Sequence, residues 1–523
     1  MIKPLSYYSD ILNKPLLALV CHFNQLSDQQ MNQLLYPEEY IRSNHPSFLD
    51  AYKLINQAIA KQEKIIVCGD FDADGICATS ILVRTLRRYT NNVGYYIPHR
   101  SEEGYGLNMN TVELALKKNY TLFITVDNGV SANESLDMIK SANAKSIVID
   151  HHTISETVHC DVLIHTDLLD ETYGTACASG LVYQLSTLFF EDPYHAALAA
   201  VATIADMVDL WGFNRSLVIR GLDAINTHHY ETIWALCDKI NVLDEQGLSF
   251  QIIPKINAIG RLNEDINVNQ MVEYFISTSS ESILAMAKRI FDLNNKRKLI
   301  NETMYLSSLT QINDDHTINI VSDPAFHEGV VGITAGKLVE LTHKPSIVLA
   351  FRNGMYKGSA RSIEGYDLRV ILKESLQYAN RFGGHAMAYG LSIKEENFAD
   401  FIQSVYSHTD TLTLDLFKPK ESLVFDGDLF NLNSYRELLD YGPFGQGFKL
   451  PMVLVGPLQL EAYRSIKGGF KAGISYQGQY LDIVSFKYAV EECIGQLRSY
   501  IGVLQINTFR ETSKLSLLVQ SVI

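Results

Sequence analysis

Short apolar runs recur along the first half of the chain, and their length and period indicate the elements that they form. Residues 64–69 read Lys-Ile-Ile-Val-Cys-Gly, and similar runs cover residues 122–126 and 146–149. Each run is followed by polar residues and then by a stretch with helical periodicity, such as residues 76–89. Short runs rich in β-branched residues are typical of buried strands. The pattern predicts an α/β domain with three buried parallel strands.

A different pattern follows this domain. Residues 281–304 are helical in period and mixed in charge, which predicts a long connecting helix. Residues 318–321 and 345–351 then read as strands on either side of a helix over residues 329–342, as in a second, smaller α/β unit. From about residue 418 onward, short alternating runs separated by glycine-containing turns predict a small β-barrel.

The length agrees with several domains. A chain of 523 residues is too long for one hydrophobic core, because domains average about 150 residues. We expect four parts: an N-terminal segment with a catalytic domain over 1–245, a helical connector over 246–304, a smaller α/β domain over 305–415 and a barrel over 416–523.

Composition narrows the class of protein. The hydrophobic content of 47% and charged content of 20% are ordinary for a globular protein. The sequence has no apolar run of 18 residues and no signal pattern at its start, so we expect a cytoplasmic protein that does not enter a membrane. The 7 cysteines are scattered without a C-x-x-C pair, which favours reduced thiols.

The net charge of −15 argues against binding nucleic acid through a broadly basic surface. A polyanionic substrate would need a local basic groove. An acidic surplus also results when carboxylates gather around divalent cations, although surface solubility explains such a surplus equally well.

Acidic and histidine residues follow each of the three predicted strands. In open α/β sheets the ligand binds beyond the carboxyl ends of the strands, so these side chains should meet in one crevice. Carboxylates packed so closely would repel one another and need a cation. The predicted metal ligands are Asp70, Asp72, Asp74, Asp127, His151 and Asp206.

Oxygen ligands with a minority of imidazole suit Mn²⁺ or Mg²⁺. Two such ions, roughly 3.5–4 Å apart, clamp a phosphate and generate a hydroxide nucleophile, so the predicted reaction is phosphoester hydrolysis. Each residue also has a simpler interpretation. An Asp-x-Asp pair is often a turn or a helix cap, His151 and His152 beside Asp150 could form a structural hydrogen-bond cluster, and Asp206 could pair with a basic neighbour.

Several motifs resemble a known family. The segments Asp-Phe-Asp-Ala-Asp-Gly, Val-Asp-Asn-Gly, Asp-His-His and Ile-Ala-Asp are similar to the four motifs of the DHH phosphoesterase superfamily, and Gly-Gly-His-Ala-Met-Ala from residue 383 is similar to its DHH-associated domain. Pro-Lys-Ile-Asn-Ala-Ile-Gly-Arg-Leu from residue 254, His-Glu-Gly-Val-Val-Gly-Ile from residue 327, Gly-Ser-Ala-Arg-Ser from residue 358 and Pro-Phe-Gly-Gln-Gly from residue 443 resemble RecJ exonucleases. The resemblance covers roughly residues 35–523.

The resemblance implies a fold and a set of roles. It implies a DHH domain with a parallel sheet, a DHH-associated domain and an OB-fold. It places Asp72, Asp74, Asp127, His151 and Asp206 on the metals, with Asp70 and Asp150 in or beside the shell. His152 would face the scissile phosphate or its leaving oxygen, and Gly384 and His385 would approach it from the opposite wall; Asp150, His152 and His385 are the predicted catalytic residues.

DNA-binding roles are implied in the same way. Arg261, Ser359 and Arg361 correspond to a 5′-phosphate pocket, and Arg100 and Tyr105 to residues that grip the strand near the active site. An OB-fold binds single strands through aromatic and basic side chains. The candidates in the barrel are Phe444, Phe448, Tyr463, Lys467, Phe470 and Lys471.

The resulting hypothesis is a 5′→3′ exonuclease for single-stranded DNA in repair and recombination, monomeric, with a single-strand-binding protein and a helicase as possible partners. The alternatives are an oligoribonuclease or nucleotide phosphatase of the same superfamily, and an inactive nucleic-acid-binding scaffold. The sequence departs from the family at residues 175–180, which lack part of its glycine-rich run, so the loop geometry there is open.

Overall fold

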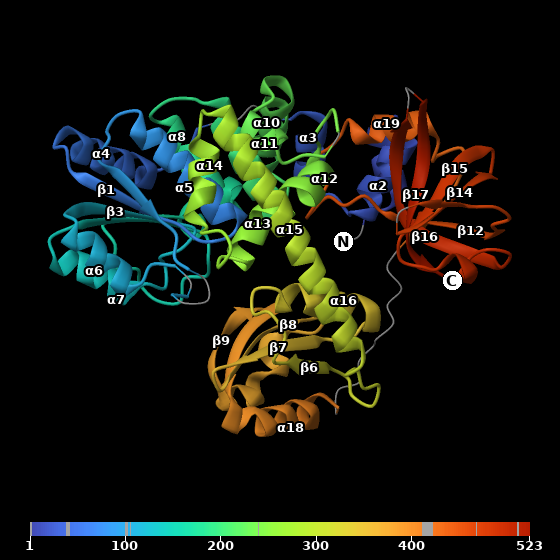
Figure 1. Ribbon diagram of the computed structural model, residues 1–523. Helices are drawn as coiled ribbons and strands as arrows, with labels where there is room; N and C mark the ends of the chain where they lie inside the picture. Colours follow the sequence, from blue (N-terminus) through green and yellow to red (C-terminus); the bar gives the residue numbers. More distant parts are fainter. Residues whose placement is uncertain are drawn as a thin grey trace.

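The computed structural model describes residues 3–37, 42–99, 103–104, 106–238, 240–410, 422–466, 468–509 and 512–523. Figure 1 shows three bodies: a large α/β domain, a smaller α/β domain at the far end of a long helix, and a β-rich domain on the other side of the large one. Within the described ranges, no helix combines the length and the apolar character needed to cross a membrane.

The large domain is built on a five-stranded parallel sheet of order β2-β1-β3-β4-β5. The three predicted strands are its β1, β3 and β4, and they lie side by side in the sheet. The strands are β1 (Lys64–Cys68), β2 (Val93–Tyr96), β3 (Tyr120–Val126), β4 (Lys145–Asp150) and β5 (Val162–His165).

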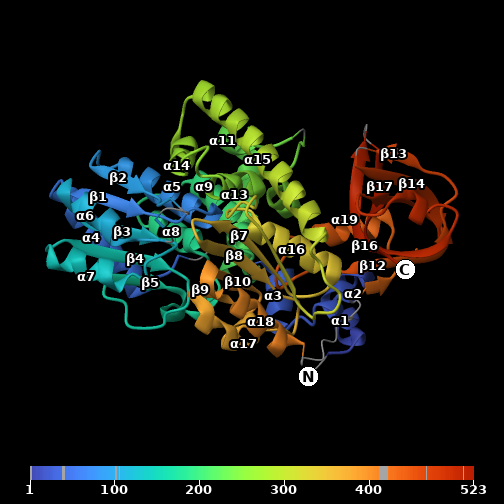
Figure 2. The same cartoon turned by 60° about the horizontal axis from the view of Figure 1, so that its bottom comes forward.

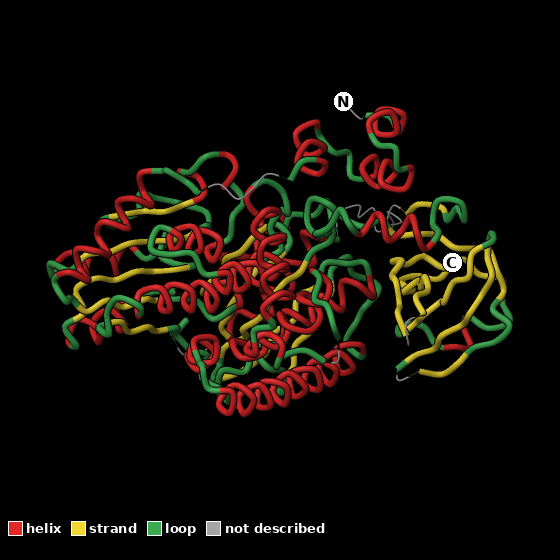
Figure 3. The backbone as a smooth tube through the Cα atoms, turned by 90° about the horizontal axis from the view of Figure 1, so that it is seen from above, coloured by secondary structure: helices red, strands yellow, loops and turns green. Residues whose placement is uncertain are grey.

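Helices cover both faces of this sheet, as Figure 3 shows from above. Successive side chains of a strand point to opposite faces. Ile65 and Val67 of β1 therefore pack into one core with one set of helices, and Ile66 and Cys68 pack into another. The first set comprises α4 (Pro46–Ala60), α5 (Ala73–Arg87), α8 (Ala178–Thr187) and α9 (Pro193–Ala205), and the second comprises α6 (Met109–Lys117) and α7 (Asn133–Ser141).

Further helices lead from the sheet to the second domain. They are α10 (Phe213–His228), α11 (Glu231–Trp234), α12 (Glu245–Gly247), a π-helix (Leu248–Ile252), α13 (Ile253–Arg261), α14 (Asn269–Ile276) and α15 (Ser280–Leu309). The 30-residue α15 confirms the predicted connecting helix and extends it at both ends. Its Met304 packs in the same core as Val321 and Val348 of the second domain, so the helix is a structural part of both domains.

The second domain contains a mixed sheet of order β6-β7-β8-β10-β9. Only β6 and β7 are parallel, and the remaining pairs are antiparallel. Its strands are β6 (Asn319–Asp323), β7 (Ser346–Arg352), β8 (Met355–Arg361), β9 (Ala379–His385) and β10 (Ala388–Lys394), and its helices are α16 (Val331–Thr342), α17 (Leu368–Ile371) and α18 (Phe398–Thr409).

The third domain is a seven-stranded sheet of order β11-β12-β16-β17-β15-β14-β13, as the short alternating runs predict. Its strands are β11 (Ser422–Val424), β12 (Met452–Gln459), β13 (Arg464–Ile466), β14 (Gly469–Tyr476), β15 (Gln479–Ser485), β16 (Leu497–Phe509) and β17 (Thr512–Val522), and α19 (Leu432–Leu439) lies before β12.

The N-terminal segment packs differently from its predicted grouping with the catalytic domain over 1–245. Helices α1 (Leu5–Ile11), α2 (Pro15–Phe23) and α3 (Asp28–Leu35) share one core with the third domain. Their apolar faces, carrying Leu16, Leu17 and Met31, are buried against the barrel, and Asn24 exchanges two hydrogen bonds with the backbone of Lys449. Figure 1 shows α2 beside α19.

Candidate metal centre

The acidic loop after β1 ends in a capped helix. Asp72 is the N-cap of α5, because its Oδ1 accepts hydrogen bonds from the backbone of Asp74 at 3.0 Å and Gly75 at 3.2 Å. A helix begins readily after such a cap. Asp74 therefore lies in the first turn of α5, whereas the sequence pattern placed all three carboxylates in one loop and began the helix at residue 76.

Asp74 is held by a segment about a hundred residues away. The backbone N–H groups of Ala178 and Ser179, in the first turn of α8, donate to its two carboxylate oxygens, each at 2.8 Å. The Ser179 hydroxyl also donates to the Asp74 carbonyl at 2.8 Å. The start of a helix favours a negative charge. Ala178 and Ser179 lie in the segment 175–180, where the sequence differs from the glycine-rich run of the family. The sequence did not predict that this segment supports Asp74.

Helix α13 supports the same loop from another side. The Asn257 side chain accepts a hydrogen bond from the backbone of Ala73 at 2.9 Å. A Cβ atom added to Gly260 would lie 2.1 Å from the Phe71 carbonyl oxygen, so only glycine permits this approach. The Pro-Lys-Ile-Asn-Ala-Ile-Gly-Arg-Leu motif therefore fixes the backbone that carries the acidic residues.

The predicted ligands from separate strand ends do meet. Nε2 of His151 lies 3.2 Å from Oδ1 of Asp127 and 3.8 Å from Oδ2 of Asp74. Nδ1 of His151 lies 3.7 Å from Oδ2 of Asp206. Three groups offer ligand atoms within 4.8 Å of one another: Asp127 with His151 and His152, Asp74 with His151 and Asp206, and Asp70 with Asp72 and Asp127.

The electrostatics of this cluster favour a cation. Burial raises the pKa of the Asp127 carboxyl well above its usual range, and repulsion from Asp74 and Asp72 adds to the effect. Burial, with repulsion from the same two residues, raises the pKa of Asp206 to about 8. Asp206 is also the C-cap of α9, where the helix dipole disfavours a negative charge. A divalent ion would remove these penalties.

Asp150 orients the histidine pair. Its Oδ1 accepts hydrogen bonds from the backbone of His151 at 2.8 Å, the backbone of His152 at 3.2 Å and Nδ1 of His152 at 2.8 Å. Burial opposes its ionisation, but these bonds leave the pKa of Asp150 below its usual value. Burial likewise opposes the charge on His152, yet the bond to Asp150 leaves the pKa of His152 above its usual value. The structure places Asp150 as a partner of His152.

Comparison with known proteins gives a consistent result along the chain. Residues 64–208 match the model of the DHH family N-terminal domain, residues 315–408 the DHHA1 domain, and residues 424–521 the RecJ OB domain. The chain is 33% identical over 521 residues to the single-stranded-DNA-specific exonuclease RecJ of Haemophilus influenzae, a match that covers 90% of each protein. The chain belongs to the RecJ family.

Other RecJ proteins support this assignment. The RecJ of Bacillus subtilis is 32% identical over 494 residues, which are 90% of this chain and 62% of that protein, so the chain spans less than two thirds of that relative. The crystal structure of Thermus thermophilus RecJ in complex with Mn²⁺ shares the fold, with a TM-score of 0.84 over 100% of this chain and 78% of that one, at 24% identity. A structure of an exonuclease RecJ bound to manganese has a TM-score of 0.62 at 29% identity, over 73% of this chain and 99% of that one.

The matches confirm the predicted domain types, and the individual residues can be placed within these domains. Arg361 and Ser359 lie on β8, where Nη1 of Arg361 donates to Oγ of Ser359 at 2.5 Å. A Cβ at Gly332, in the first turn of α16, would lie 2.9 Å from Nη2 of Arg361. Arg261 donates to the Gly329 carbonyl at 3.2 Å. The three predicted phosphate-binding residues therefore gather around the start of α16.

The remaining RecJ-like candidates divide into two groups. Gly384 and His385 lie on β9, the exposed edge strand of the second sheet, so both are accessible to a ligand. Arg100, Tyr105 and Lys467 lie outside the described residues.

The barrel aromatics require a correction. Phe444, Phe448 and Phe470 are buried in the core of the third domain, because their apolar rings complete its packing, and they cannot stack on a base. Lys471 pairs with the buried Asp482 at 2.7 Å. Tyr463, at 48% exposure, is the described candidate whose ring is accessible.

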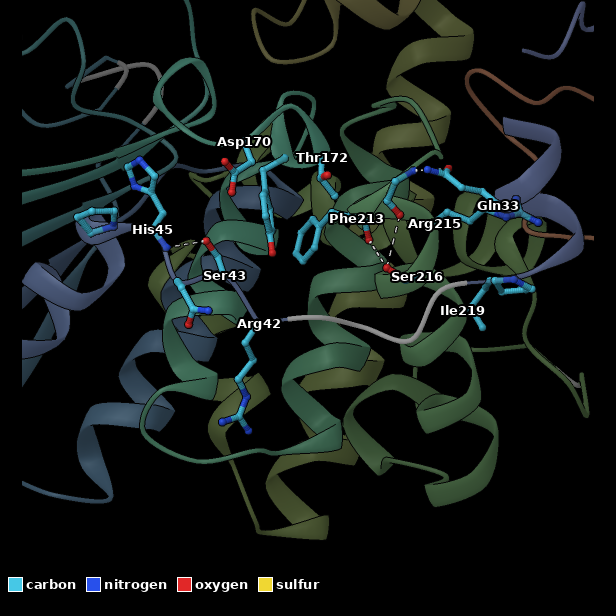
Figure 4. Close-up of a pocket in the computed structure, with 15 residues that line it drawn as sticks. Gln33, Arg42, Ser43, His45, Asp170, Thr172, Phe213, Arg215, Ser216 and Ile219 are labelled. Carbon is cyan, nitrogen blue, oxygen red and sulfur yellow. Dashed lines mark hydrogen bonds between the residues drawn. The ribbon is translucent and has the colours of Figure 1, made fainter. Parts of the chain in front are cut away.

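Two cavities differ in their relation to the metal centre. One, of about 270 Å³, lies against His151. It is also lined by Met207 and Asp209, which follow α9, and by Gln446, which belongs to the third domain. Another of about 510 Å³ lies between residues 42–46 and α10 and is shown in Figure 4. None of the residues that line this second cavity belongs to the acidic cluster, so the candidate chemistry lies elsewhere.

Proposed function

We propose that the protein is a 5′→3′ exonuclease that hydrolyses single-stranded DNA with two divalent ions, Mn²⁺ or Mg²⁺. The observation that carries the proposal is the pair of ligand groups that meet beside His151: Asp70, Asp72 and Asp127 in one, Asp74, His151 and Asp206 in the other. Carboxylate oxygens with one imidazole fit these ions. The relatives that cover most of the chain carry the name of a single-stranded-DNA-specific exonuclease.

The residues fit a two-ion site in charge as well as in donor type. The raised pKa values of Asp127 and Asp206 result first from burial and then from repulsion by Asp74 and Asp72, and bound cations would offset both effects. When bound, the ions would polarise the scissile phosphate and supply a hydroxide at neutral pH. The protein holds the carboxylates in place through the backbone of α8 and the side chain of Asn257.

His152 supplies the proton chemistry in this proposal. Its Nδ1–H is fixed by Asp150, which leaves Nε2 to face the substrate. Because its pKa is raised, His152 carries a positive charge over a wider pH range than an ordinary histidine. It would stabilise the charge that develops on the phosphate and donate a proton to the leaving oxygen. Asp150 keeps the ring in this orientation, and His385 would contact the phosphate from the second domain.

The 5′ polarity rests on the group around the start of α16. A helix N-terminus and forked guanidinium groups are both favourable for a terminal phosphate. Arg361 and Ser359 lie together, and Arg261 reaches the backbone just before this helix. Gly384, with an accessible backbone on β9, would let a phosphate approach closely. The family resemblance also assigns strand binding to Arg100 and Tyr105, which lie outside the described residues.

The cellular setting follows from the same activity. An enzyme that consumes single strands acts in DNA repair and recombination, with a helicase to supply the strand and a single-strand-binding protein to cover it. We also predict that the protein is a monomer and that it acts in the cytoplasm.

The test is digestion of end-labelled strands of several dozen nucleotides, DNA and RNA, labelled at the 5′ or the 3′ end, with Mn²⁺, Mg²⁺ or a chelator. We expect rapid release of the 5′ label from DNA with either metal and no release with chelator. Faster cleavage of dinucleotides than of long DNA would indicate an oligoribonuclease. The absence of hydrolysis with both metals would indicate a scaffold.

A further inference from the structure

Two segments far apart in sequence lie against each other beside the metal centre. One is the Asp206 loop, residues 206–212, which joins α9 to α10. The other is the docking segment, residues 442–448, which precedes β12 in the third domain. The Gln446 carbonyl accepts a hydrogen bond from the backbone of Leu210 at 2.9 Å, and the Gly447 carbonyl accepts one from Nε1 of Trp211 at 2.9 Å.

The glycines of the docking segment permit this approach. A Cβ at Gly445 would lie 2.7 Å from Cδ1 of Leu210. Gly447 has a φ of +79°, and a Cβ there would lie 3.0 Å from Nε1 of Trp211 and 3.2 Å from Oδ1 of Asp209. The Pro-Phe-Gly-Gln-Gly motif, which phosphoester chemistry does not explain, therefore has a structural reason.

Arg215 of α10 holds the start of the docking segment. Its guanidinium donates to the carbonyls of Tyr441 at 2.6 Å, Gly442 at 3.0 Å and Pro443 at 3.1 Å. The residue is only 4% exposed, and Figure 4 shows it among the residues that line the 510 Å³ cavity. A buried guanidinium that satisfies three carbonyls makes a directional contact, so the third domain is fixed on α10 in one orientation.

The opposite end of the Asp206 loop is part of the metal centre. The Asp206 carboxylate lies 3.7 Å from Nδ1 of His151. The next residue, Met207, has a φ of +55°, a conformation that a non-glycine residue keeps only when its surroundings impose it. Gln446 and Met207 both line the 270 Å³ cavity against His151, so the docking segment reaches the edge of the ligand group.

We propose that the docking segment positions the carboxylate of Asp206, so that the C-terminal domain helps to hold a divalent ion as well as any DNA. The inference rests on the proposed two-ion function. A carboxylate at the end of a loop contributes fully to a metal site only when the loop is held still, as outer contacts of metal ligands generally require. Here the hydrogen bonds at Leu210 and Trp211 hold it.

The test compares two glycine substitutions with the same backbone cost. Gly447→Ala adds a methyl group against Trp211, whereas Gly478, with a φ of +76° in the turn between β14 and β15, has no atom within 4 Å of the added Cβ. Gly478→Ala is therefore the matched control. Trp211→Phe is a milder variant that keeps an aromatic side chain, although a smaller one, and removes the indole N–H that donates to Gly447.

Mn²⁺ binding to each full-length variant is measured by titration calorimetry without DNA, and folding is checked by thermal unfolding in chelator. We expect Gly447→Ala to weaken Mn²⁺ binding at one site about tenfold, Trp211→Phe to weaken it a few-fold, and Gly478→Ala to leave it unchanged. Activity of the Gly447→Ala protein should recover at high Mn²⁺ concentration.

Equal Mn²⁺ affinities in all four proteins would overturn the inference and leave the exonuclease proposal intact. If Gly447→Ala does not fold, the Trp211→Phe protein decides by itself in the same way. If the unsubstituted protein binds no Mn²⁺ or Mg²⁺, both the inference and the two-ion function are wrong.

Discussion

Nε2 of His151 lies 3.2 Å from a carboxylate oxygen of Asp127, although the two residues come from the ends of different strands. Asp127 belongs to two of the three ligand groups, one with Asp70 and Asp72 and one with the histidines. It has a φ of +62°, which asparagine tolerates better than alanine does. Asp127→Asn is therefore the substitution that removes the charge with the least effect on the backbone.

We expect Asp127→Asn to lower metal-dependent hydrolysis of single-stranded DNA by more than about a hundredfold, because a carboxylate is lost from two of the three ligand groups. Metal-free stability at pH 8 should be unchanged or higher, since a buried, repelled carboxyl becomes neutral. The measurements are initial rates and thermal melts in chelator. The control is Asp137→Asn, at an exposed aspartate paired with His159, which should change neither the rate nor the melting temperature. If Asp127→Asn keeps nearly the activity of the unsubstituted protein, Asp127 is not part of the site.

The raised pKa of Asp206 makes a prediction about pH. The pKa of Asp206 is about 8 in the folded protein, whereas an aspartate in an unfolded chain has a pKa of about 3.9. The folded state therefore binds more protons than the unfolded state between these two pH values. The contribution of Asp206 to stability is present at low pH and is lost as pH rises through about 8. Between pH 7 and 8.5, above the range of His151, the melting temperature in chelator should fall.

Mg²⁺ should reverse this dependence, because the ion competes with the proton for the carboxylate and binds more tightly as pH rises. The measurement is the melting temperature at four pH values, with chelator or with Mg²⁺. Asp206→Asn should flatten the slope in chelator. A slope that is identical in this variant would assign the pH dependence to other groups.

Much of the metal centre follows from sequence because parallel strands end at one edge of a sheet. The positions of Asp127 and His151 after two predicted strands were enough to bring them together. The supports could not be found in this way. Ala178 and Ser179 act through backbone N–H groups, which any residue carries, so no side-chain pattern marks them.

The barrel shows a second limit. The resemblance to an OB-fold supplies candidate aromatic residues but not the direction in which each ring points, and Phe444 and Phe448, both predicted to bind DNA, lie in the core. The N-terminal helices show a third limit. An amphipathic pattern indicates that one face of a helix is buried, but it does not indicate which domain covers that face. Helices α1, α2 and α3 are adjacent in sequence to the large domain and pack on the third domain.

Helix α13 makes a prediction about the acidic loop. In Gly260→Ala the new Cβ would lie 2.1 Å from the Phe71 carbonyl oxygen, and backbone must move to relieve the clash. We expect a loss of about 1–3 kcal/mol in the free energy of unfolding, as for other overpacked sites, together with weaker Mn²⁺ binding. Urea unfolding and calorimetry measure the two effects.

The matched control is Gly336→Ala, in α16, where the added Cβ has no atom within 4 Å. It should keep Mn²⁺ binding and gain up to about 1 kcal/mol, because alanine is the better helix former. If Gly260→Ala is as stable as the unsubstituted protein, α13 does not constrain the loop.

Arg361 makes a prediction about the strand end. Its guanidinium lies beside Ser359 and the first turn of α16, where a 5′-phosphate would be held by charged hydrogen bonds. Such bonds contribute about 1.5–3 kcal/mol, so Arg361→Ala should reduce the preference for a 5′-phosphate over a 5′-hydroxyl about ten- to a hundredfold. The measurement is the ratio of kcat/KM values for the two strands.

The kcat on a saturating 5′-hydroxyl strand should change little in Arg361→Ala, because the metal ligands are untouched. Arg369→Ala removes an exposed arginine of the same domain that pairs with Asp367, and it should leave the ratio unchanged. An unaltered ratio in Arg361→Ala would show that the end is recognised elsewhere, whereas an equal loss on both strands would mean that Arg361 serves the chemistry instead of the terminus.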